Sequence, residues 1–555
     1  MMSLSMLRIC LKRIGYVGMC VHVMSLSSLA WVQPAPVTVS SRVLEQSTCS
    51  GRFVTHDLDH ISQVPGGDTV RMFEANGGGV AMNDLDNDGD LDIVLANHAA
   101  PNTILWNMGQ LEFMTELMDI GDSRAVSLFD FDGDGWQDIL LSRQTSAPNF
   151  WRNLADGTFQ QVILSGVTKP LYAVNWADFD QDGDIDLAGA SYDAALLTEF
   201  GHEFLESGRG GVYVYSNNSD GSFAETRLHH QAQALAFAVL DFNDDQRLDI
   251  LVGNDFAVPD MAWLNQGTNW QAVTPFSAIS HSTMSFDLAD IDNDGQTELF
   301  STDMKPYADA DLAAWQPVME AMMADPHPEG DPQVMENVLQ ERTEDGFTNG
   351  ATNRGIDASG WSWSGKFADF NQDGFVDLYI VNGMMEESTF AHLDNHELVE
   401  ENQAFRNDGS GNFVSAAEWG LASRASGRGM SIADVDNDGD LDIVVNNLRA
   451  SAQLFENQLC EGNSLQVDLN WPGSGNTDVI GASVKVQTNR SSYYRTLYAA
   501  SGYLSADSSR LHVGFPIGEA LSVVEITWPD GYHSKIYNAK PNSLLTVTRD
   551  DISLD

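Results

Sequence analysis

Short runs of alternating apolar and polar residues recur along most of the chain, each followed by a dense group of acidic residues. Segments such as GGVAMN, RAVSLF and GMSIA precede the acidic groups, and apolar runs such as LDIVLA, DILLS and LDIVVNN follow them. Each unit continues with an aromatic segment ending in Asn (ILWN, FWRN), a Gly-containing turn and another alternating run. The pattern predicts four short β-strands per unit, with the acidic group between the first two.

The acidic group follows a nine-residue pattern, D-x-D-x-D-G-x-x-D, that occurs seven times. The loops, numbered one to seven, cover residues 84–92, 130–138, 178–186, 241–249, 290–298, 369–377 and 434–442. Four-stranded units repeated in this way predict an all-β fold with a seven-bladed β-propeller over residues 49–460. A stacked solenoid is the alternative, which we disfavour because units of this length favour radial closure.

The two ends of the repeat region predict how the ring closes. The seventh unit has three predicted strands, the last ending at LFEN, before the chain changes character. Ahead of the first unit stands an isolated strand-like segment, RFVTH, at residues 52–56. If it supplies the fourth strand of the seventh blade, Cys49 and Cys460 flank the seam. We expect these two to form a disulfide, with two unpaired thiols as the alternative.

The spacing of the acidic residues indicates a cation site in each loop. Positions 1, 3 and 5 supply side-chain oxygens, Gly at position 6 permits a sharp turn, position 7 offers its backbone carbonyl, and position 9 closes the shell. Hard oxygen ligands favour Ca2+ over zinc, and Mg2+ keeps more of its own water. Up to seven Ca2+ ions are expected. The alternative is that these are ordinary acidic surface turns. That interpretation would explain a single copy, but it does not explain seven copies at the same position in the repeat.

The candidate ligands at positions 1, 3, 5, 7 and 9 are Asp84, Asp86, Asp88, Asp90 and Asp92 in loop one; Asp130, Asp132, Asp134, Trp136 and Asp138 in loop two; Asp178, Asp180, Asp182, Asp184 and Asp186 in loop three; Asp241, Asn243, Asp245, Arg247 and Asp249 in loop four; Asp290, Asp292, Asp294, Gln296 and Glu298 in loop five; Asp369, Asn371, Asp373, Phe375 and Asp377 in loop six; and Asp434, Asp436, Asp438, Asp440 and Asp442 in loop seven.

The loops are unequal, which predicts a ranking of their affinities. Asn243 and Asn371 keep an oxygen at position 3 but remove a charge. Gln246 replaces the turn Gly of loop four, where a positive φ is costly for a residue with a side chain. We expect loops one, three and seven to bind Ca2+ most tightly and loop four most weakly.

Composition narrows the classes of partner. The 555 residues include 80 acidic and 28 basic residues, for a formal net charge of −52. This balance argues against nucleic acid and anionic membranes, which both require a basic surface. Apolar residues make up 43% of the chain, with 13 Trp and 26 Phe, which argues against disorder.

The amino terminus predicts export. Arg8, Lys12 and Arg13 precede an apolar run over residues 14–29 and a small residue, Ala30. We interpret residues 1–30 as a signal peptide and 31–48 as a linker, with an uncleaved membrane anchor as the alternative. No other stretch is long and apolar enough to span a bilayer. An extracellular, cell-surface or periplasmic location is expected.

The repeats resemble the calcium-binding blades of the FG-GAP and VCBS repeat families, known from integrin-α propellers. The resemblance covers about residues 85–456, although the Phe-Gly and Gly-Ala-Pro signatures are mostly missing. The segments SGYLS, RLHVGF and WPDG, farther on, resemble the ASPIC/UnbV domain, which follows such propellers in the cartilage acidic protein family and its bacterial relatives. The alternating strands there predict a small β-sandwich over residues 461–550. The resemblance implies domain order rather than a reaction.

Three long connections between second and third strands, at residues 191–210, 304–334 and 383–402, are expected opposite the calcium loops, on a face suited to binding. His392 and His396 would share one face of a helix and could hold a transition metal, although a solvated polar helix is the stronger interpretation. Asp287 and Lys366 occupy equal positions in adjacent blades, which suggests an ion pair.

These features favour an exported, calcium-stabilised scaffold, expected to be monomeric, that binds a protein or glycan. The alternative is an enzyme, a hydrolase or lyase acting on polysaccharide, with its site on the face opposite the loops. The sequence shows none of the HExxH, nucleophile-elbow or phosphate-binding motifs that would identify a reaction. A periplasmic assembly factor is the third hypothesis.

Overall fold

The computed structural model describes residues 34–45, 48–67, 69–256, 258–324, 330–344 and 346–550. The expected signal peptide and the first residues of the expected linker lie outside these ranges. Within the described ranges, no helix combines the length and apolar character needed to cross a membrane.

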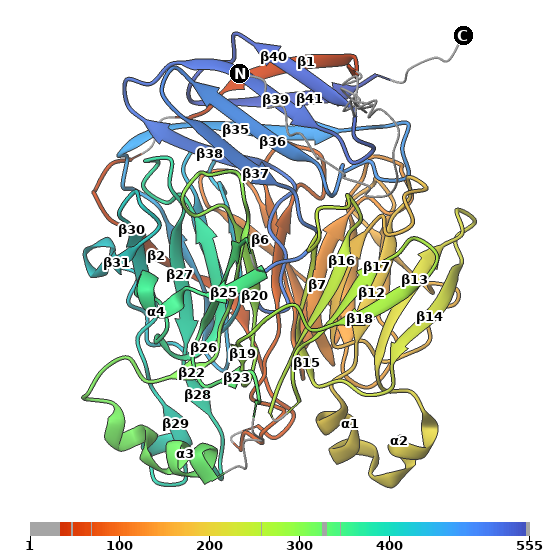
Figure 1. The fold of residues 1–555 in the computed structure, drawn as a ribbon, viewed down its shortest axis with the longest axis vertical. Coiled ribbons are helices and arrows are strands. Elements are labelled where there is room, and N and C mark those ends of the chain that lie inside the picture. Colours follow the sequence, from red (N-terminus) through yellow and green to blue (C-terminus); the bar gives the residue numbers. More distant parts are fainter. Residues whose placement is uncertain are drawn as a thin grey trace, which may run out of the picture. The chain divides into compact units, whose positions relative to one another are not determined.

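Seven four-stranded antiparallel arrangements carry the seven acidic loops (Figure 1). In chain order of their loops they are β3 (Val80–Asn83), β4 (Asp92–Leu95), β5 (Pro101–Asn107), β6 (Phe113–Ile120); β7 (Ser123–Phe129), β8 (Asp138–Arg143), β9 (Asn149–Asn153), β10 (Phe159–Val162); β11 (Ala173–Ala177), β12 (Asp186–Ala190), β13 (Val212–Asn217), β14 (Phe223–His229); β15 (Ala234–Leu240), β16 (Asp249–Asn254), β17 (Met261–Asn265), β18 (Trp270–Val273); β20 (Phe286–Ala289), β21 (Glu298–Ser301), β24 (Val338–Thr343), β25 (Gly346–Asn349); β26 (Gly360–Ala368), β27 (Asp377–Asn382), β30 (Gln403–Asn407), β31 (Phe413–Ser415), extended by β22 (Met304–Lys305); and β32 (Gly427–Ala433), β33 (Asp442–Asn447), β34 (Ser451–Glu456), β2 (Val54–Ile61).

The first strands of these sheets contact one another in a closed circuit. They follow the order β3, β7, β11, β15, β20, β26 and β32, and β32 returns to contact β3. Both faces of a first strand therefore pack against other strands, which explains why every residue of β7 is buried although Ser and Arg are among them. The predicted all-β, propeller-like fold is confirmed.

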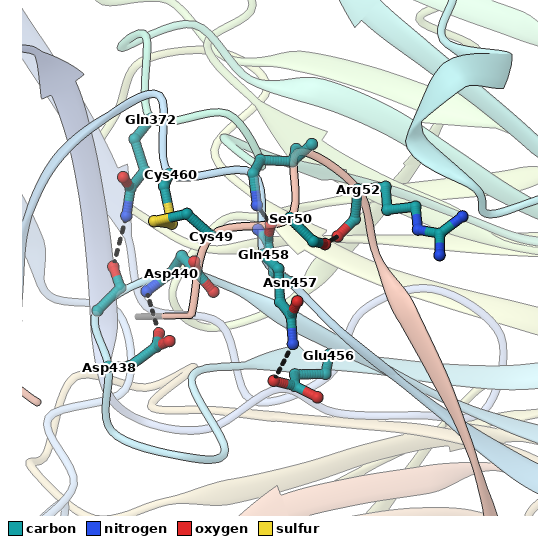
Figure 2. The surroundings of a disulfide bond; sticks show 12 residues. Cys49, Ser50, Arg52, Gln372, Asp438, Asp440, Glu456, Asn457, Gln458 and Cys460 are labelled. Carbon is teal, nitrogen blue, oxygen red and sulfur yellow. Dashed lines mark hydrogen bonds between the residues drawn. A yellow bond between two sulfur atoms is a disulfide. The ribbon is translucent and has the colours of Figure 1, made fainter. Parts of the chain in front are cut away.

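The circuit closes by pairing the two ends of the repeat region, as the sequence predicts. Strand β2 pairs antiparallel with β34, with Thr55 opposite Phe455. Cys49 and Cys460 form a disulfide with their Cα atoms 5.7 Å apart, across a sequence separation of 411 residues. Figure 2 shows the disulfide beside Gln372 of loop six and Asp438 and Asp440 of loop seven.

The C-terminal region folds into two four-stranded sheets around a separate apolar core. One has the order β1 (Val37–Val43), β41 (Ser543–Arg549), β35 (Gly462–Asn470), β38 (Leu511–Pro516), and the other β37 (Ser492–Thr496), β36 (Ser483–Thr488), β39 (Leu521–Thr527), β40 (His533–Tyr537). Strand β1 comes from residues that we expected to be a linker. It pairs with β41 along its whole length, so this segment is part of the second domain.

A segment of the C-terminal domain, residues 501–507, runs among the first strands of the propeller, and we call it the axial segment. Its backbone hydrogen bonds join Gly502 N–H to Phe286 O at 2.8 Å, Val126 N–H to Leu504 O at 3.1 Å and Ala506 N–H to Val80 O at 3.2 Å. Strands β20, β7 and β3 supply these partners. The approach is so close that a Cβ added to Gly79 would lie 1.7 Å from Leu504 O.

The remaining elements lie in connections. They are β19 (Ile279–Ser280) paired with β23 (Gln333–Val334), β28 (Met384–Met385) paired with β29 (Glu397–Leu398), helices α1 (Asp193–Phe200), α2 (His202–Ser207), α3 (Leu312–Ala324) and α4 (Ala351–Arg354), and the short helices η1 (Asp394–His396) and η2 (Ala417–Trp419). In Figure 1, α1, α2 and α3 lie at the bottom, whereas strands β35 to β41 lie at the top.

Removing the disulfide should destabilise the closed circuit. We expect Cys460→Ser to lower the free energy of unfolding by about 2–4 kcal/mol, because the cross-link restricts the unfolded chain. Urea unfolding under oxidising conditions measures the change. The Cys49→Ser variant and the double variant should show the same loss as the single change, and reductant should remove the difference from wild type. Additive losses in the double variant would contradict the prediction.

Candidate metal centres

Each acidic loop occupies the whole connection between a first and a second strand. In every loop the first strand ends one residue before position 1, and position 9 is the first residue of the second strand. Asp84, for example, directly follows β3, and Asp92 begins β4. Rigid strands therefore hold both ends of every candidate ligand set.

Backbone N–H groups organise the carboxylates at positions 1 and 9. In loop one, the N–H groups of Asp88 and Gly89 donate to the two oxygens of Asp84 at 3.2 and 3.0 Å. The N–H of Leu85 donates to Asp92 at 2.9 Å. The same bonds recur in the other six loops. All seven loops thus share one conformation.

Two positions in each loop have a positive φ, although the sequence pattern indicated only one. Position 6 is Gly in six loops, and Gln246 of loop four adopts φ 67°, the strained geometry that we predicted. Position 4 also has a positive φ, for example at Asn87 and Asn437. The frequent Asn at position 4 was the available sequence signal, since Asn tolerates this region better than most residues.

Five loops gather three carboxylates tightly enough to hold one ion. The possible ligand atoms of each group lie within 4.8 Å of one another, and the groups are Asp84, Asp86 and Asp92; Asp130, Asp132 and Asp138; Asp178, Asp180 and Asp186; Asp290, Asp292 and Asp294; and Asp434, Asp436 and Asp442. Loops four and six have Asn243 and Asn371 at position 3, so their ligand sets carry fewer negative charges. The Asp-rich groups could therefore bind metal ions.

Burial makes these clustered charges costly. It raises the pKa of Asp92, Asp138 and Asp186 to about 8, against the backbone N–H groups that favour the ionised form. In loop seven, Asp440 is 1% exposed and both of its carboxylate oxygens lack a hydrogen-bond partner among the described residues. Unpartnered buried oxygens and mutually repelling carboxylates fit a hard divalent cation, because a cation supplies the missing charge and contacts.

Hydrogen bonds from third strands connect neighbouring loops, a role that the sequence pattern did not reveal. Asn153, the last residue of β9, donates to Leu85 O in the preceding loop at 2.8 Å. Equivalent bonds run from Asn107 to Val435 O, Asn265 to Phe179 O, Asn407 to Ile291 O and Asn457 to Phe370 O. Arg342 takes this place in β24 and donates to Phe242 O at 3.0 Å. The recurring Asn was visible, but its partner lies in another unit.

Arginine side chains compete with a cation in some loops. Arg152 forms ion pairs with Asp132 and with Asp134 of loop two. Arg354 pairs with Asp292 of loop five at 3.6 Å. In loop four, Arg342 pairs with Asp244 at position 4, which is not a candidate ligand. Arginine would therefore compete with a cation for candidate ligands in loops two and five.

The C-terminal domain covers the loops, which we did not predict. Asp478 accepts the N–H of Asp130 at 2.6 Å, and Thr477 donates to the Asp130 carboxylate at 2.9 Å. Gln466 donates to the carboxylate of Asp434 in loop seven. Candidate metal centres of loops two and seven therefore lie at the interface of two domains.

The expected ion pair between Asp287 and Lys366 is replaced by another. Lys366 pairs with Asp507 of the axial segment, and Asp287 accepts the N–H of Phe367 at 2.6 Å. The sequence placed Asp287 and Lys366 at equal positions but contained no indication that a carboxylate from the C-terminal domain would enter between the blades.

The two histidines of the sixth unit do not share a helix face. Residues Asp394–His396 form only a short helix, with Asn395 and His396 at positive φ. His392 Nε2 lies 2.9 Å from Ala314 O of α3, so it joins two insertions. The helical metal pair considered from the sequence is therefore wrong, and the solvated polar helix that we favoured is reduced to this single exposed turn.

Comparisons with known proteins agree with this architecture. A model of FG-GAP-like repeats matches residues 84–141, 130–189, 241–301 and 393–445, and a model of the ASPIC and UnbV domain matches residues 472–553. Cartilage acidic protein 1 of Mus musculus is 24% identical over 523 residues, which cover 84% of this chain and 73% of the relative. The Homo sapiens protein is 24% identical over 562 residues, covering 84% and 71%.

Solved structures that align with part of this chain include a lectin of Agrocybe aegerita, described as recognising non-reducing terminal N-acetylglucosamine. It has 15% identity and a TM-score of 0.38, covering 74% of this chain and all of the lectin. BBS1N in complex with ARL6DN has 8% identity and a TM-score of 0.40, covering 75% and 98%. The chain therefore contains FG-GAP-like repeats and a C-terminal ASPIC and UnbV domain.

Proposed function

We propose that this protein is an exported scaffold whose propeller is stabilised by Ca2+ and whose face opposite the loops binds a protein or glycan partner. The three-carboxylate clusters, repeated in phase in five loops, are the observation that carries the proposal. The disulfide supports an oxidising compartment, in agreement with the signal-like amino terminus.

The connections between second and third strands supply the proposed binding face. Large apolar side chains are exposed on these connections, namely Leu197 (40%), Phe200 (37%), Phe256 (39%), Leu312 (42%) and Val399 (51%). Exposed apolar residues gathered on the loops of a rigid scaffold favour a protein partner, because such residues gain most from being covered.

The insertions are anchored rather than free. Trp315 of α3 is fully buried, contacts Trp361 and donates from Nε1 to Glu400 at 2.9 Å. Together with the contact between His392 and Ala314, this bond fixes the insertion of the fifth unit to that of the sixth. A partner would therefore meet a preformed surface, which lowers the entropy lost on binding.

Removing Ca2+ should destabilise the protein. We expect EDTA to lower the thermal midpoint markedly and added Ca2+ to restore it, because each ion neutralises carboxylates that otherwise repel one another. Differential scanning calorimetry measures both states. Equal midpoints with EDTA and with Ca2+ would rule out calcium stabilisation, and recovery with Mg2+ alone would rule out calcium selectivity.

Single-loop variants should reveal the ranking of the sites. Asp178→Asn in loop three should remove one tight site, because no arginine is paired with the carboxylates of that loop in the described structure. Asp241→Asn in loop four is the matched control and should leave the number of tight sites unchanged. Isothermal titration calorimetry counts the sites. Loss of a tight site in the loop-four variant would contradict the ranking.

Charge placed on the proposed face should abolish partner binding. We expect a Phe200→Glu, Leu312→Glu variant to lose ligands that the wild type captures from a glycan array or from immobilised extracellular proteins. The matched control changes Met114 and Leu117 to Glu, since these side chains are 55% and 64% exposed on the outer strand β6. Equal loss in both variants would contradict binding through the face of the insertions.

A further inference from the structure

One lysine is enclosed where the C-terminal domain enters the propeller. Lys366, on the first strand β26, has a side chain that is 1% exposed. Its Nζ pairs with the carboxylate of Asp507 and donates to Ser501 Oγ at 2.7 Å. Both partners belong to the axial segment, so this contact joins the two domains.

The carboxylate of Asp507 is held in one orientation by three donors. Oδ1 accepts the backbone N–H of Ile432 at 2.7 Å in addition to the lysine, and Oδ2 accepts Ser501 Oγ at 3.0 Å. The N–H of Ile432 polarises the bond between Cγ and Oδ1 of Asp507, which makes Cγ more electrophilic. Ser501 bridges the lysine nitrogen and the other oxygen, so a path for protons between them already exists.

A second carboxyl group lies beside this pair. Asp287 is 7% exposed, and burial raises its pKa to about 7 although the charge of Lys366 opposes the shift. The charge of Asp507 raises the same pKa, so all three groups interact electrostatically. Asp287 also lines the same chamber as Ser501 and Asp507.

We propose that Lys366 and Asp507 condense to form an isopeptide bond that covalently joins the propeller to the C-terminal domain. The Nζ–Cγ bond forms and the Cγ–Oδ2 bond breaks. Two protons leave the lysine nitrogen by way of Ser501 Oγ, which lies within hydrogen-bond distance of both Nζ and Oδ2, and both end on the departing Oδ2. One ammonium and one carboxylate thus become one neutral amide and one water, with no oxidant or other reactant.

The fold supplies the two conditions that this condensation needs. Amide formation from separate ions in water is unfavourable, but groups held in reacting geometry reach effective molarities of about 10^5–10^8 M. The side chain of Lys366 is 1% exposed, which keeps bulk water from the nitrogen, whereas that of Asp507 is 35% exposed. The reaction also removes the charge of a buried ammonium, which is costly to keep. Asp507 also lines a chamber of about 320 Å3 between the two domains, which can receive the released water.

Another lysine provides an internal comparison. Lys305 pairs with both Glu336 and Asp357, but its side chain is 32% exposed, against 1% for Lys366. Water therefore reaches the Lys305 ammonium, and two carboxylates stabilise it, whereas Lys366 pairs with one. Lys305 should therefore remain an ordinary ion pair, which makes it the matched negative control within the same chain.

Mass spectrometry of the full-length folded protein tests the proposal. After reduction of the disulfide, the intact mass should be lower than the sequence mass, for the observed amino terminus, by one water molecule. Proteolysis of the denatured protein should release one branched peptide pair containing Lys366 and Asp507, and none containing Lys305. An intact mass equal to the sequence mass, with Lys366 and Asp507 in separate unmodified peptides, would overturn the proposal.

Two variants separate the chemistry from a merely structural ion pair. Lys366→Arg keeps the positive charge but lacks the nucleophile, so the water loss and the branched peptide should both disappear. Ser501→Ala retains both reacting groups but lacks the bridging hydroxyl, and we expect a smaller cross-linked fraction at a given time after refolding. Circular dichroism confirms that each variant folds. Full cross-linking in the folded Ser501→Ala variant would overturn the assigned proton path, and a water loss that survives Lys366→Arg would overturn the assigned bond.

Discussion

At five loops, carboxylates from different positions of one nine-residue turn have oxygens within 4.8 Å of one another, a separation at which like charges repel strongly. The strands on either side leave these groups little freedom to separate, because position 9 is already part of the second strand. Backbone N–H groups satisfy the carboxylates only in part, as the two unpartnered oxygens of Asp440 show. A bound cation would relieve this repulsion, so the stability of the propeller should depend on occupancy of the proposed Ca2+ sites.

The loops are also connected to one another. Third-strand residues such as Asn153 and Arg342 donate to carbonyl oxygens in the preceding loop. A change of conformation in one loop therefore alters the hydrogen bonds of its neighbour. The unit repeats in sequence, but its stability depends on the adjacent unit, as in other repeat architectures.

The second domain completes the propeller rather than merely following it. Thr477 and Asp478 contact loop two, and the axial segment contributes hydrogen bonds to three first strands. Strand β1, which precedes the repeats, pairs with β41 near the end of the chain. Both termini of the described chain thus belong to one sheet. This arrangement leaves the insertions carrying Phe200 and Leu312 on the opposite face, where we propose that a partner binds.

The sequence by itself predicted the four-stranded unit, the carboxylate-rich loop between its first two strands, the seam at residues 52–56 and the pairing of Cys49 with Cys460. These features depend on local periodicity and on the counting of strands, which contiguous residues encode. Only the tertiary structure decided that Lys366 pairs with Asp507 rather than Asp287, that the expected linker forms strand β1, and that the C-terminal domain covers the loops. Those contacts join residues far apart in the chain. They form because two buried surfaces are complementary, and local sequence patterns do not encode that complementarity.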